Sequence, residues 1–186
     1  MRNFRYFSCF GRGDSGINNA YRDIPCYRVM NMKKPNYLWW ILGTEAVGIL
    51  SGLLSREGTA IYNTQAVKPV LSPPALLFPI VWGILYALMG IGAARIAATD
   101  ASPQRSRGLN LYVIQLTLNF FWSLIFFNLQ RYGLAFLWLI LLWLAVIAMI
   151  LEFRKTDPPA AWIQIPYLLW LSFAAYLSFA VWQQNR

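Results

Sequence analysis

The sequence predicts an all-α integral membrane protein, a bundle of five transmembrane helices. Only 12% of its 186 residues are charged and 58% are hydrophobic, whereas a soluble domain carries about 25% charged residues. Several apolar segments of about 20 residues follow one another after a polar tail, which is the length needed to span a bilayer. Lipid offers no partner to unpaired backbone groups, and the alternation expected of barrel strands is absent, so these segments must be helices.

The N-terminal tail, residues 1–36, is polar and basic, with seven Lys/Arg and two Asp. We expect it to be disordered or to be an extension from an upstream start codon. No apolar core of a secretory signal precedes Tyr37, and Asp14 and Asp23 interrupt the pattern of a mitochondrial transit peptide. Residues 37–186 are then one five-helix membrane domain.

The expected spans lie in order along this domain. The first covers residues 37–55, and the others cover residues 75–98, 108–129, 132–151 and 159–182. At 1.5 Å per residue, each can cross a hydrocarbon core about 30 Å thick. Only a few residues around Gln130 and Arg131 separate the third span from the fourth, so these two helices are predicted to be antiparallel neighbours.

The longest connection, residues 56–74, is a candidate lid over a binding site. It contains Pro69, Pro73 and Pro74, and proline both removes a backbone donor and disfavours helix in the preceding residue. The connection is therefore predicted to be extended or turn-like. A long, partly apolar loop beside a small bundle can close a pocket or can be a plain connector.

The distribution of basic residues predicts the orientation in the membrane. The tail and the second and fourth connections hold 12 Lys/Arg, and the opposite side holds four. The positive-inside rule then places the N-terminus in the cytoplasm, and a bacterial cell membrane is the expected location. Without residues 1–31 the excess falls to seven against four. The basic residues lie between apolar segments, not on one patch, so no nucleic-acid partner is expected.

The residue inventory limits the chemistry that the protein can perform. There is no histidine, which excludes imidazole metal sites and histidine-based acid–base or nucleophilic catalysis. The two cysteines, Cys9 and Cys26, lie in the tail and belong to no metal-ligand cluster. We therefore expect no metal, no cofactor and no conventional enzyme activity.

Tryptophan is frequent, with nine residues in the chain. Those near span ends, such as Trp39, are typical interfacial anchors. Trp82 and Trp170 lie deeper, and each follows a proline, Pro79 or Pro166, by a few residues. Aromatic stripes at helical spacing are more often packing or lipid-facing than ligand-binding. Proline kinks in these spans would open space inside the bundle and so favour a pocket.

Two polar side chains, Asn119 and Glu45, lie in the middle of spans. A buried amide costs free energy unless it is hydrogen-bonded, so Asn119 either pairs with another helix or contacts a ligand. A carboxylate at this depth costs about 2.5–3.5 kcal/mol, so Glu45 should face the interior or stay protonated. Nearby, Gly48 and Gly52 form a small-xxx-small pair that permits close helix packing.

Three ordered stretches resemble the translocator protein family, also called the TspO/MBR, tryptophan-rich sensory protein or peripheral benzodiazepine receptor family. They are IYNTQAVKPVLSPPALLFPIVWGILYALMG, QLTLNFFWSLIFF and PYLLWLSFAAYLSFAVWQQN. The resemblance covers about residues 37–185. Ile61 and Leu71 stand where the family pattern usually has tryptophan, so this loop is less aromatic than the pattern.

The resemblance implies a five-helix bundle, often a homodimer, with a pocket closed by the first loop. It implies a receptor or sensor for porphyrins such as protoporphyrin IX, with membrane lipid as the surroundings and, in some members, cholesterol or benzodiazepine-type ligands. The C-terminal cholesterol consensus is absent, because the first basic residue after Tyr176 is Arg186.

By motif position the implied pocket includes Tyr62, Trp82, Asn119, Trp170 and Ala174, and to these we add their face neighbours Trp122 and Tyr167. Flat apolar macrocycles stack on indoles, and one amide can orient them. Two alternatives remain open. Some bacterial members degrade porphyrins in light, which would make Trp82 and Trp170 redox-active indoles, and a transporter could use Glu45 as a coupling group.

Overall fold

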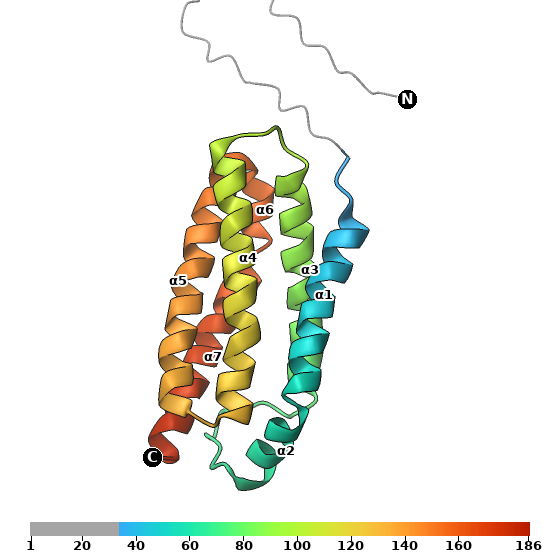
Figure 1. Cartoon of the computed structure of the whole chain (residues 1–186). Coiled ribbons are helices and arrows are strands. Elements are labelled where there is room, and N and C mark those ends of the chain that lie inside the picture. The colour runs from blue at the N-terminus through green and yellow to red at the C-terminus, as the bar shows by residue number, and fades with distance from the viewer. Residues whose placement is uncertain (1–33) are drawn as a thin grey trace, which may run out of the picture.

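The computed structural model describes residues 34–186, and five of its helices are long and apolar enough to span a membrane (Figure 1). The predicted all-α, multi-pass membrane architecture is therefore confirmed. The predictions for residues 1–33 lie outside the described residues. The spans are Tyr37–Leu54, Leu77–Ala97, Pro103–Asn128, Tyr132–Thr156 and Pro158–Gln184.

The spans close into a ring. Helix α1 (Tyr37–Leu54) lies beside α3 (Leu77–Ala97) and α4 (Pro103–Ser123), and α7 (Ile165–Gln184) lies beside α3 and α5 (Tyr132–Thr156). Helices α4 and α5 pack against each other, as their short connection predicts. The turn between them passes through Gln130 at φ 51°, a left-handed conformation that reverses the chain within a few residues.

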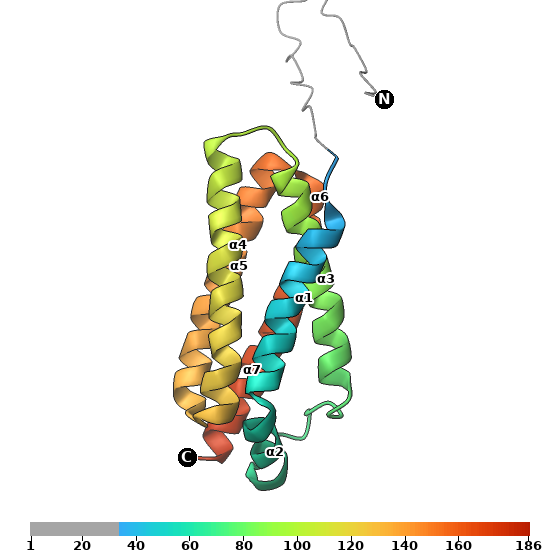
Figure 2. The same ribbon diagram turned by 45° about the vertical axis from the view of Figure 1, so that its right-hand side comes forward.

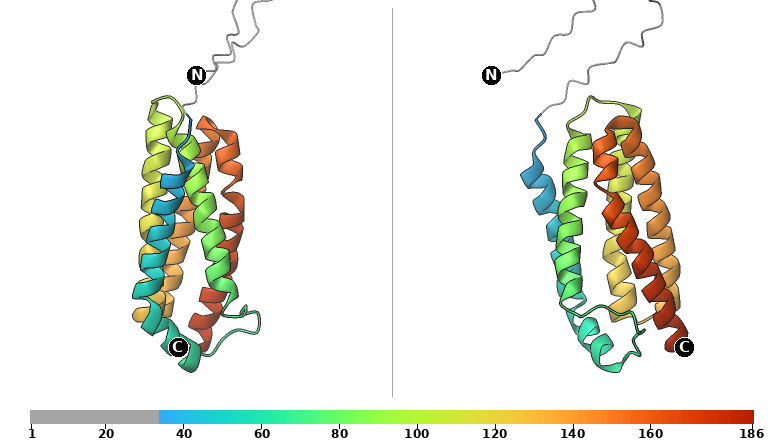
Figure 3. Two further views of the ribbon diagram at one scale, coloured as in Figure 1. Left: turned by 90° about the vertical axis from the view of Figure 1, so that its right-hand side faces the viewer. Right: turned by 180° about the vertical axis from the view of Figure 1, so that it is seen from behind.

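The two ends of the bundle differ (Figures 1 and 2). Helix α2 (Arg56–Gln65), the start of α5 and the C-terminus lie at one end, which we call the α2 end. The start of α1, the α3–α4 loop and the short helix α6 (Pro158–Trp162) lie at the other. Figure 3 shows the same arrangement from the side and from behind.

The first connection differs from its prediction. Residues 56–65 form helix α2, and only residues 66–76 are non-helical. The prolines act as expected, since Pro69, Pro73 and Pro74 all lie in the non-helical part. Residues 56–68 contain no proline, so proline does not prevent a helix in the first half of the connection. Asn185 ties the loop to the C-terminus, because its amide accepts from the Val67 N–H and donates to the Val67 C=O.

The predicted proline kinks are wrong. Pro79 is the third residue of α3, and Pro166 is the second residue of α7. The first backbone N–H groups of a helix have no intrahelical acceptor, so proline is tolerated there without bending the helix. The fifth span is instead broken into α6 and α7 by a turn at Ile163 and Gln164.

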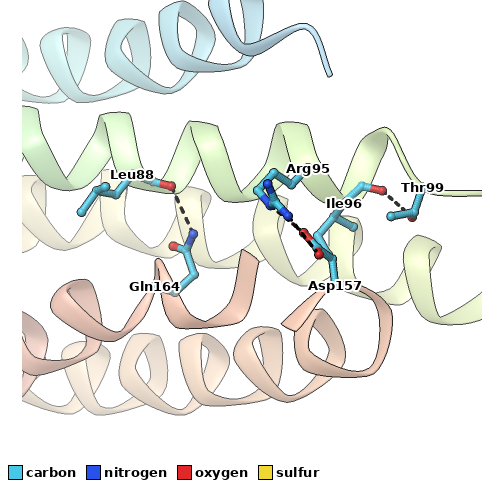
Figure 4. Close-up of polar contacts among 6 residues, drawn as sticks. All are labelled: Leu88, Arg95, Ile96, Thr99, Asp157 and Gln164. Atoms are coloured by element: carbon cyan, nitrogen blue, oxygen red, sulfur yellow. Dashed lines mark hydrogen bonds and ion pairs between the residues drawn. The ribbon is translucent and has the colours of Figure 1, made fainter. Parts of the chain in front are cut away.

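Polar contacts hold this break against α3 (Figure 4). The guanidinium of Arg95 donates to both carboxylate oxygens of Asp157, at 2.6 and 3.1 Å. Gln164, which is fully buried, donates to the Leu88 carbonyl at 3.2 Å. These two contacts join the segment that contains the break to α3, one just before α6 and one just before α7.

Glycines set the distance between α1 and α3. A Cβ at Gly90 would lie 2.8 Å from the Ile41 Cα, so the two backbones touch at this level. A Cβ at Gly48 would collide with the Tyr86 ring. At Gly52 and Gly83 a Cβ would meet no atom within 4 Å. Helices α1 and α3 are therefore in close contact in the half away from α2 and leave open space between them toward the α2 end.

Candidate functional site

A cavity of about 310 Å³ occupies this space between α1, α3 and α4. Its volume lies at the lower end of the range for ligand pockets, about 300–1,000 Å³. Ile49 lines it and is 60% exposed, so the cavity reaches the bilayer-facing surface. We call it the central cavity, and its lining residues are Glu45, Gly48, Ile49, Ser51, Gly52, Ser55, Thr59, Pro79, Trp82, Gly83, Tyr86, Asn119, Trp122, Ser123 and Phe127.

Aromatic rings from two helices form one wall of the central cavity. The ring centroid of Trp82 lies 5.6 Å from that of Tyr86 and 6.5 Å from that of Trp122. Trp122 in turn lies 5.3 Å from Phe126. Trp82 and Tyr86 are four residues apart on α3, so they share a helix face and present their rings together.

A directional chain of hydrogen bonds forms the back of the cavity. The Tyr86 hydroxyl donates to the Asn119 amide oxygen at 2.9 Å, and the Asn119 amide nitrogen donates to the Tyr167 hydroxyl at 2.8 Å. Tyr167 then donates to the Gln115 side-chain oxygen at 3.0 Å. All four side chains are buried. Asn119 therefore fulfils the helix-pairing role, with both ends of its amide bonded to protein.

Three serines line the cavity near the α2 end, and the sequence reasoning did not single them out. Ser123 on α4 lies 2.5 Å from the Ser51 hydroxyl and 3.0 Å from the Ser55 hydroxyl, both on α1. The four-residue spacing of Ser51 and Ser55 places them on one helix face. That spacing was visible in the sequence, but their partner on another span was not.

Helix α2 closes the end of the bundle through Tyr62. The Tyr62 ring packs edge-on against Phe126, Phe127 and Tyr132, with centroids 5.3, 5.6 and 6.3 Å away. Burial, with a smaller contribution from Tyr132, raises the pKa of Tyr62 to about 12. Tyr62 does not line the central cavity, but Phe127, which it contacts, does.

A second hollow of about 530 Å³ lies in the seam between α3 and α7. Trp170 lines it and packs edge-on against Phe78 at 5.9 Å. Its lining is wholly apolar, and Ile84 and Leu169 are exposed there. We call this hollow the outer groove, and it is lined by Val81, Ile84, Leu85, Leu88, Pro166, Leu169, Trp170 and Phe173.

The seven predicted pocket residues therefore do not all line one cavity in the structure. Trp82, Asn119 and Trp122 line the central cavity, and Tyr167 lies directly behind it, bonded to Asn119. Tyr62 packs on the lining from α2, Trp170 lines the outer groove, and Ala174 is buried in the core. Tyr86, which completes both the aromatic wall and the hydrogen-bond chain, was missed as a site residue although it shares a face with Trp82.

Glu45 is partly exposed and lines the central cavity. The lining as a whole is aromatic and aliphatic, with hydroxyls and one amide. Within residues 34–186, no group of three or more His, Cys, Asp or Glu side chains is placed to hold a metal ion. The arrangement is suited to holding a flat apolar molecule.

Comparison with known proteins places this architecture in a family. The profile of the TspO/MBR family matches residues 40–183. The chain is 37% identical over 141 residues to the tryptophan-rich protein TspO of Chlorobaculum tepidum, covering 75% of this chain and 89% of that one. It is 35% identical over 156 residues to the tryptophan-rich sensory protein of Cereibacter sphaeroides, covering 84% and 95%.

A human relative is also similar. The chain is 35% identical over 121 residues to the human translocator protein, covering 64% of this chain and 72% of that one. The family match spans all five membrane-crossing helices and every residue of the aromatic wall. The chain belongs to the TspO/MBR family of integral membrane proteins.

Proposed function

We propose that the protein is a membrane receptor or sensor that binds porphyrins of the protoporphyrin IX type in the central cavity. The observation that carries the proposal is the aromatic wall of Trp82, Tyr86 and Trp122 within a cavity between three spans. Indole and phenol rings stack on flat π-systems, and aromatic pairs add about 0.5–1.5 kcal/mol beyond burial of area. The relatives named tryptophan-rich sensory protein and translocator protein agree with a role in sensing or moving a small molecule.

The volume of the cavity limits how much of a porphyrin can be enclosed. A porphyrin is larger than 310 Å³, so one edge of the macrocycle must project between α1 and α3. Gly52 and Gly83 leave that seam open, because neither position has a neighbour within 4 Å of a Cβ. The inner edge would then stack on Trp82 and Trp122, with Asn119 behind them. Of the further predicted contacts, Tyr167 bonds to Asn119 from behind and Tyr62 packs on Phe127. Trp170 lies in the outer groove and Ala174 in the core, so neither lines the central cavity.

A second function is favoured by one specific distance. The indoles of Trp82 and Trp122 lie 6.5 Å apart along the same wall, so a bound, photoexcited porphyrin would contact two oxidisable side chains. Light-dependent porphyrin degradation is therefore the alternative activity of this site. The family resemblance implies Trp82 and Trp170 as its indoles. Because Trp170 lines the outer groove, we assign the second indole of this site to Trp122.

We also propose that the N-terminus faces the cytoplasm of a bacterial cell. Within the described residues, the end of the bundle opposite α2 carries Lys34, Arg95, Arg105, Arg107, Arg154 and Lys155. The α2 end carries Arg56, Lys68, Arg131 and Arg186. The positive-inside rule places the more basic end in the cytoplasm. The α2 end would then face the opposite side of the membrane.

One experiment separates these functions. Purified protein in detergent is titrated with protoporphyrin IX in the dark, and the complex is then illuminated while its absorption spectrum is recorded. Saturable binding with a porphyrin spectrum no less stable than that of free porphyrin supports the receptor. Protein-dependent loss of the porphyrin bands with a new product supports degradation. Absence of saturable binding would contradict both.

A further inference from the structure

Glu45 is the one side chain lining the central cavity that carries a full charge when ionised at neutral pH. The other lining residues are aromatic, aliphatic, hydroxyl-bearing or amide-bearing, and none is lysine or arginine. Glu45 is the ninth residue of the 18-residue helix α1, so it lies near the middle of the first span. A carboxylate at that depth is costly unless a partner compensates for it.

Within residues 34–186, the Glu45 carboxylate has no ion pair, and no other side chain donates a hydrogen bond to it. Hydroxyls in the lining already have partners: Tyr86 donates to Asn119 at 2.9 Å, and Ser123 lies within hydrogen-bond distance of Ser51 at 2.5 Å. The protein therefore leaves one strong, partly exposed acceptor facing the cavity. An acceptor without a partner at this depth favours a ligand that supplies the missing donor.

We propose that Glu45 sets the charge selectivity of the central cavity: it favours a flat apolar ligand with a cationic or N–H donor group beside α1, and disfavours a carboxylate there. The inference deepens the proposed function, on which it rests. The physical reason is that attraction between opposite charges and repulsion between like charges are both stronger in a low-dielectric cavity than in water. Selectivity then comes from a repulsive element as well as an attractive one.

For protoporphyrin IX, the same charge fixes an orientation. Its two propionates must point away from Glu45, toward the α2 end. Exposed cations lie there: Arg56 begins α2, and the Lys68 ammonium lies 5.5 Å from the Tyr62 ring centroid. The apolar vinyl edge would face the middle of the bilayer and the Trp82 wall.

The test uses three probes that share a pyrene ring and differ in one substituent: 1-pyrenemethylammonium, 1-pyrenemethanol and 1-pyrenecarboxylate. Affinities are measured by fluorescence for the full-length protein and for Glu45→Gln in the same detergent. Asp100→Asn is the matched control, because it also removes one negative charge but lies exposed in the α3–α4 loop. Comparing proteins for each probe cancels the partition of that probe into micelles.

We expect Glu45→Gln to weaken binding of the ammonium probe about tenfold, because the cation loses an oppositely charged hydrogen-bond partner, and to strengthen binding of the carboxylate probe several-fold, because a like charge is removed. Binding of the neutral alcohol should change less than twofold, which also shows that the variant is folded. Glu45→Asp keeps the charge and should keep the order of the probes. Asp100→Asn should match the wild type.

Equal changes for all three probes in Glu45→Gln would overturn the inference, as would failure of every pyrene probe to bind the wild type. The proposed function fails separately. If Glu45→Gln changes the affinities of the pyrene probes as expected but protoporphyrin IX does not bind, the cavity selects by charge and its natural ligand is not a porphyrin. If protoporphyrin IX binds and Glu45→Gln leaves the relative affinities of the probes unchanged, only the charge selectivity is wrong.

Discussion

The hydroxyl of Tyr86 on α3 donates a 2.9 Å hydrogen bond to the side-chain oxygen of Asn119 on α4. Because Asn119 also donates to Tyr167 on α7 at 2.8 Å, one amide joins three helices. A ligand that bonds to Asn119 must therefore replace one of these protein contacts. The main role of Asn119 is therefore to hold together the helices that form the cavity, and a direct contact with a ligand would be an additional role.

Replacing Asn119 with leucine should destabilise the bundle. Leucine has the same branching and the same number of side-chain heavy atoms as asparagine, but the Tyr86 hydroxyl loses its acceptor and Tyr167 loses a donor. Leaving buried polar groups unpaired costs about 1–3 kcal/mol in proteins, and interhelical hydrogen bonds in membranes average about 0.6 kcal/mol. We expect a loss of about 1–3 kcal/mol in the free energy of unfolding, measured by denaturation in mixed micelles.

The matched control is Asn110→Leu, because Asn110 lies on the same helix but is exposed. Its stability should stay within about 0.5 kcal/mol of wild type, as for surface substitutions in general. Equal stability of the two variants would show that the Tyr86–Asn119–Tyr167 chain contributes nothing to the packing of the three helices.

Gly58 determines how closely α2 sits on the end of the bundle. A Cβ at this position would lie 2.5 Å from the backbone carbonyl of Phe127, so Gly58→Ala must push α2 away. Overpacking of this kind costs about 1–3 kcal/mol. We expect faster tryptic cleavage after the exposed Arg56 in the folded protein.

The control for this variant is Gly43→Ala, since a Cβ there meets no atom within 4 Å. Alanine is the better helix former by about 1 kcal/mol, so Gly43→Ala should be as resistant to trypsin as wild type or more so. Unchanged cleavage in Gly58→Ala would mean that α2 is not seated against Phe127.

The phenol of Tyr62 should ionise at unusually high pH. Burial raises its pKa to about 12, above the value near 10 for an exposed tyrosine. The docked α2 therefore holds the proton more tightly than the undocked state. The stabilisation from Tyr62 is complete below about pH 10 and is lost as the pH rises through about 12.

Tyrosinate absorbance measures this ionisation directly. Subtracting the titration of Tyr62→Phe, which keeps the ring, from that of wild type isolates the contribution of Tyr62. The difference curve should have its midpoint near pH 12. A midpoint near pH 10 would show that the ring is exposed to water and that α2 does not close the bundle.

The orientation predicts the side on which the C-terminus lies. Arg186 is at the α2 end, the less basic end, and should face away from the cytoplasm. In a bacterial host, alkaline phosphatase fused after Arg186 should be active and green fluorescent protein fused there should be dark. The reverse pattern would invert the proposed orientation.

The five spans were predictable because lipid imposes a simple requirement, a run of about 20 apolar residues. The exact ends of the spans were less predictable from the sequence. Helix α4 begins at Pro103, before the expected start at residue 108, because its first five residues are mostly polar, with Arg105 and Arg107, and precede the apolar run. The Ser102 cap, which accepts from the Arg105 N–H at 3.1 Å, is the signal that marked the true start.

Helix α2 gave no membrane signal at all, because it is short and polar and lies outside the spans. A site residue was predicted correctly only where a residue implied by the family motif also lies on the helix face that lines the cavity. Trp82 and Asn119 line the cavity as expected, whereas Trp170 lines the outer groove. The rotation of α7 about its own axis decides which way Trp170 faces, and it depends on packing against α3 and α5, which spacing within one helix does not encode.

The central claim is that the aromatic wall binds a porphyrin, and the affinity of Trp82→Leu for protoporphyrin IX tests it most directly. Quenching of tryptophan fluorescence gives the dissociation constant for wild type, for Trp82→Leu and for the control Trp39→Leu, whose side chain is 69% exposed on α1. Losing one aromatic contact of about 0.5–1.5 kcal/mol should weaken binding about 2- to 13-fold in Trp82→Leu. Trp39→Leu should bind like wild type, and Trp170→Leu, in the outer groove, should lose less affinity than Trp82→Leu. Equal dissociation constants for wild type and Trp82→Leu would contradict the claim.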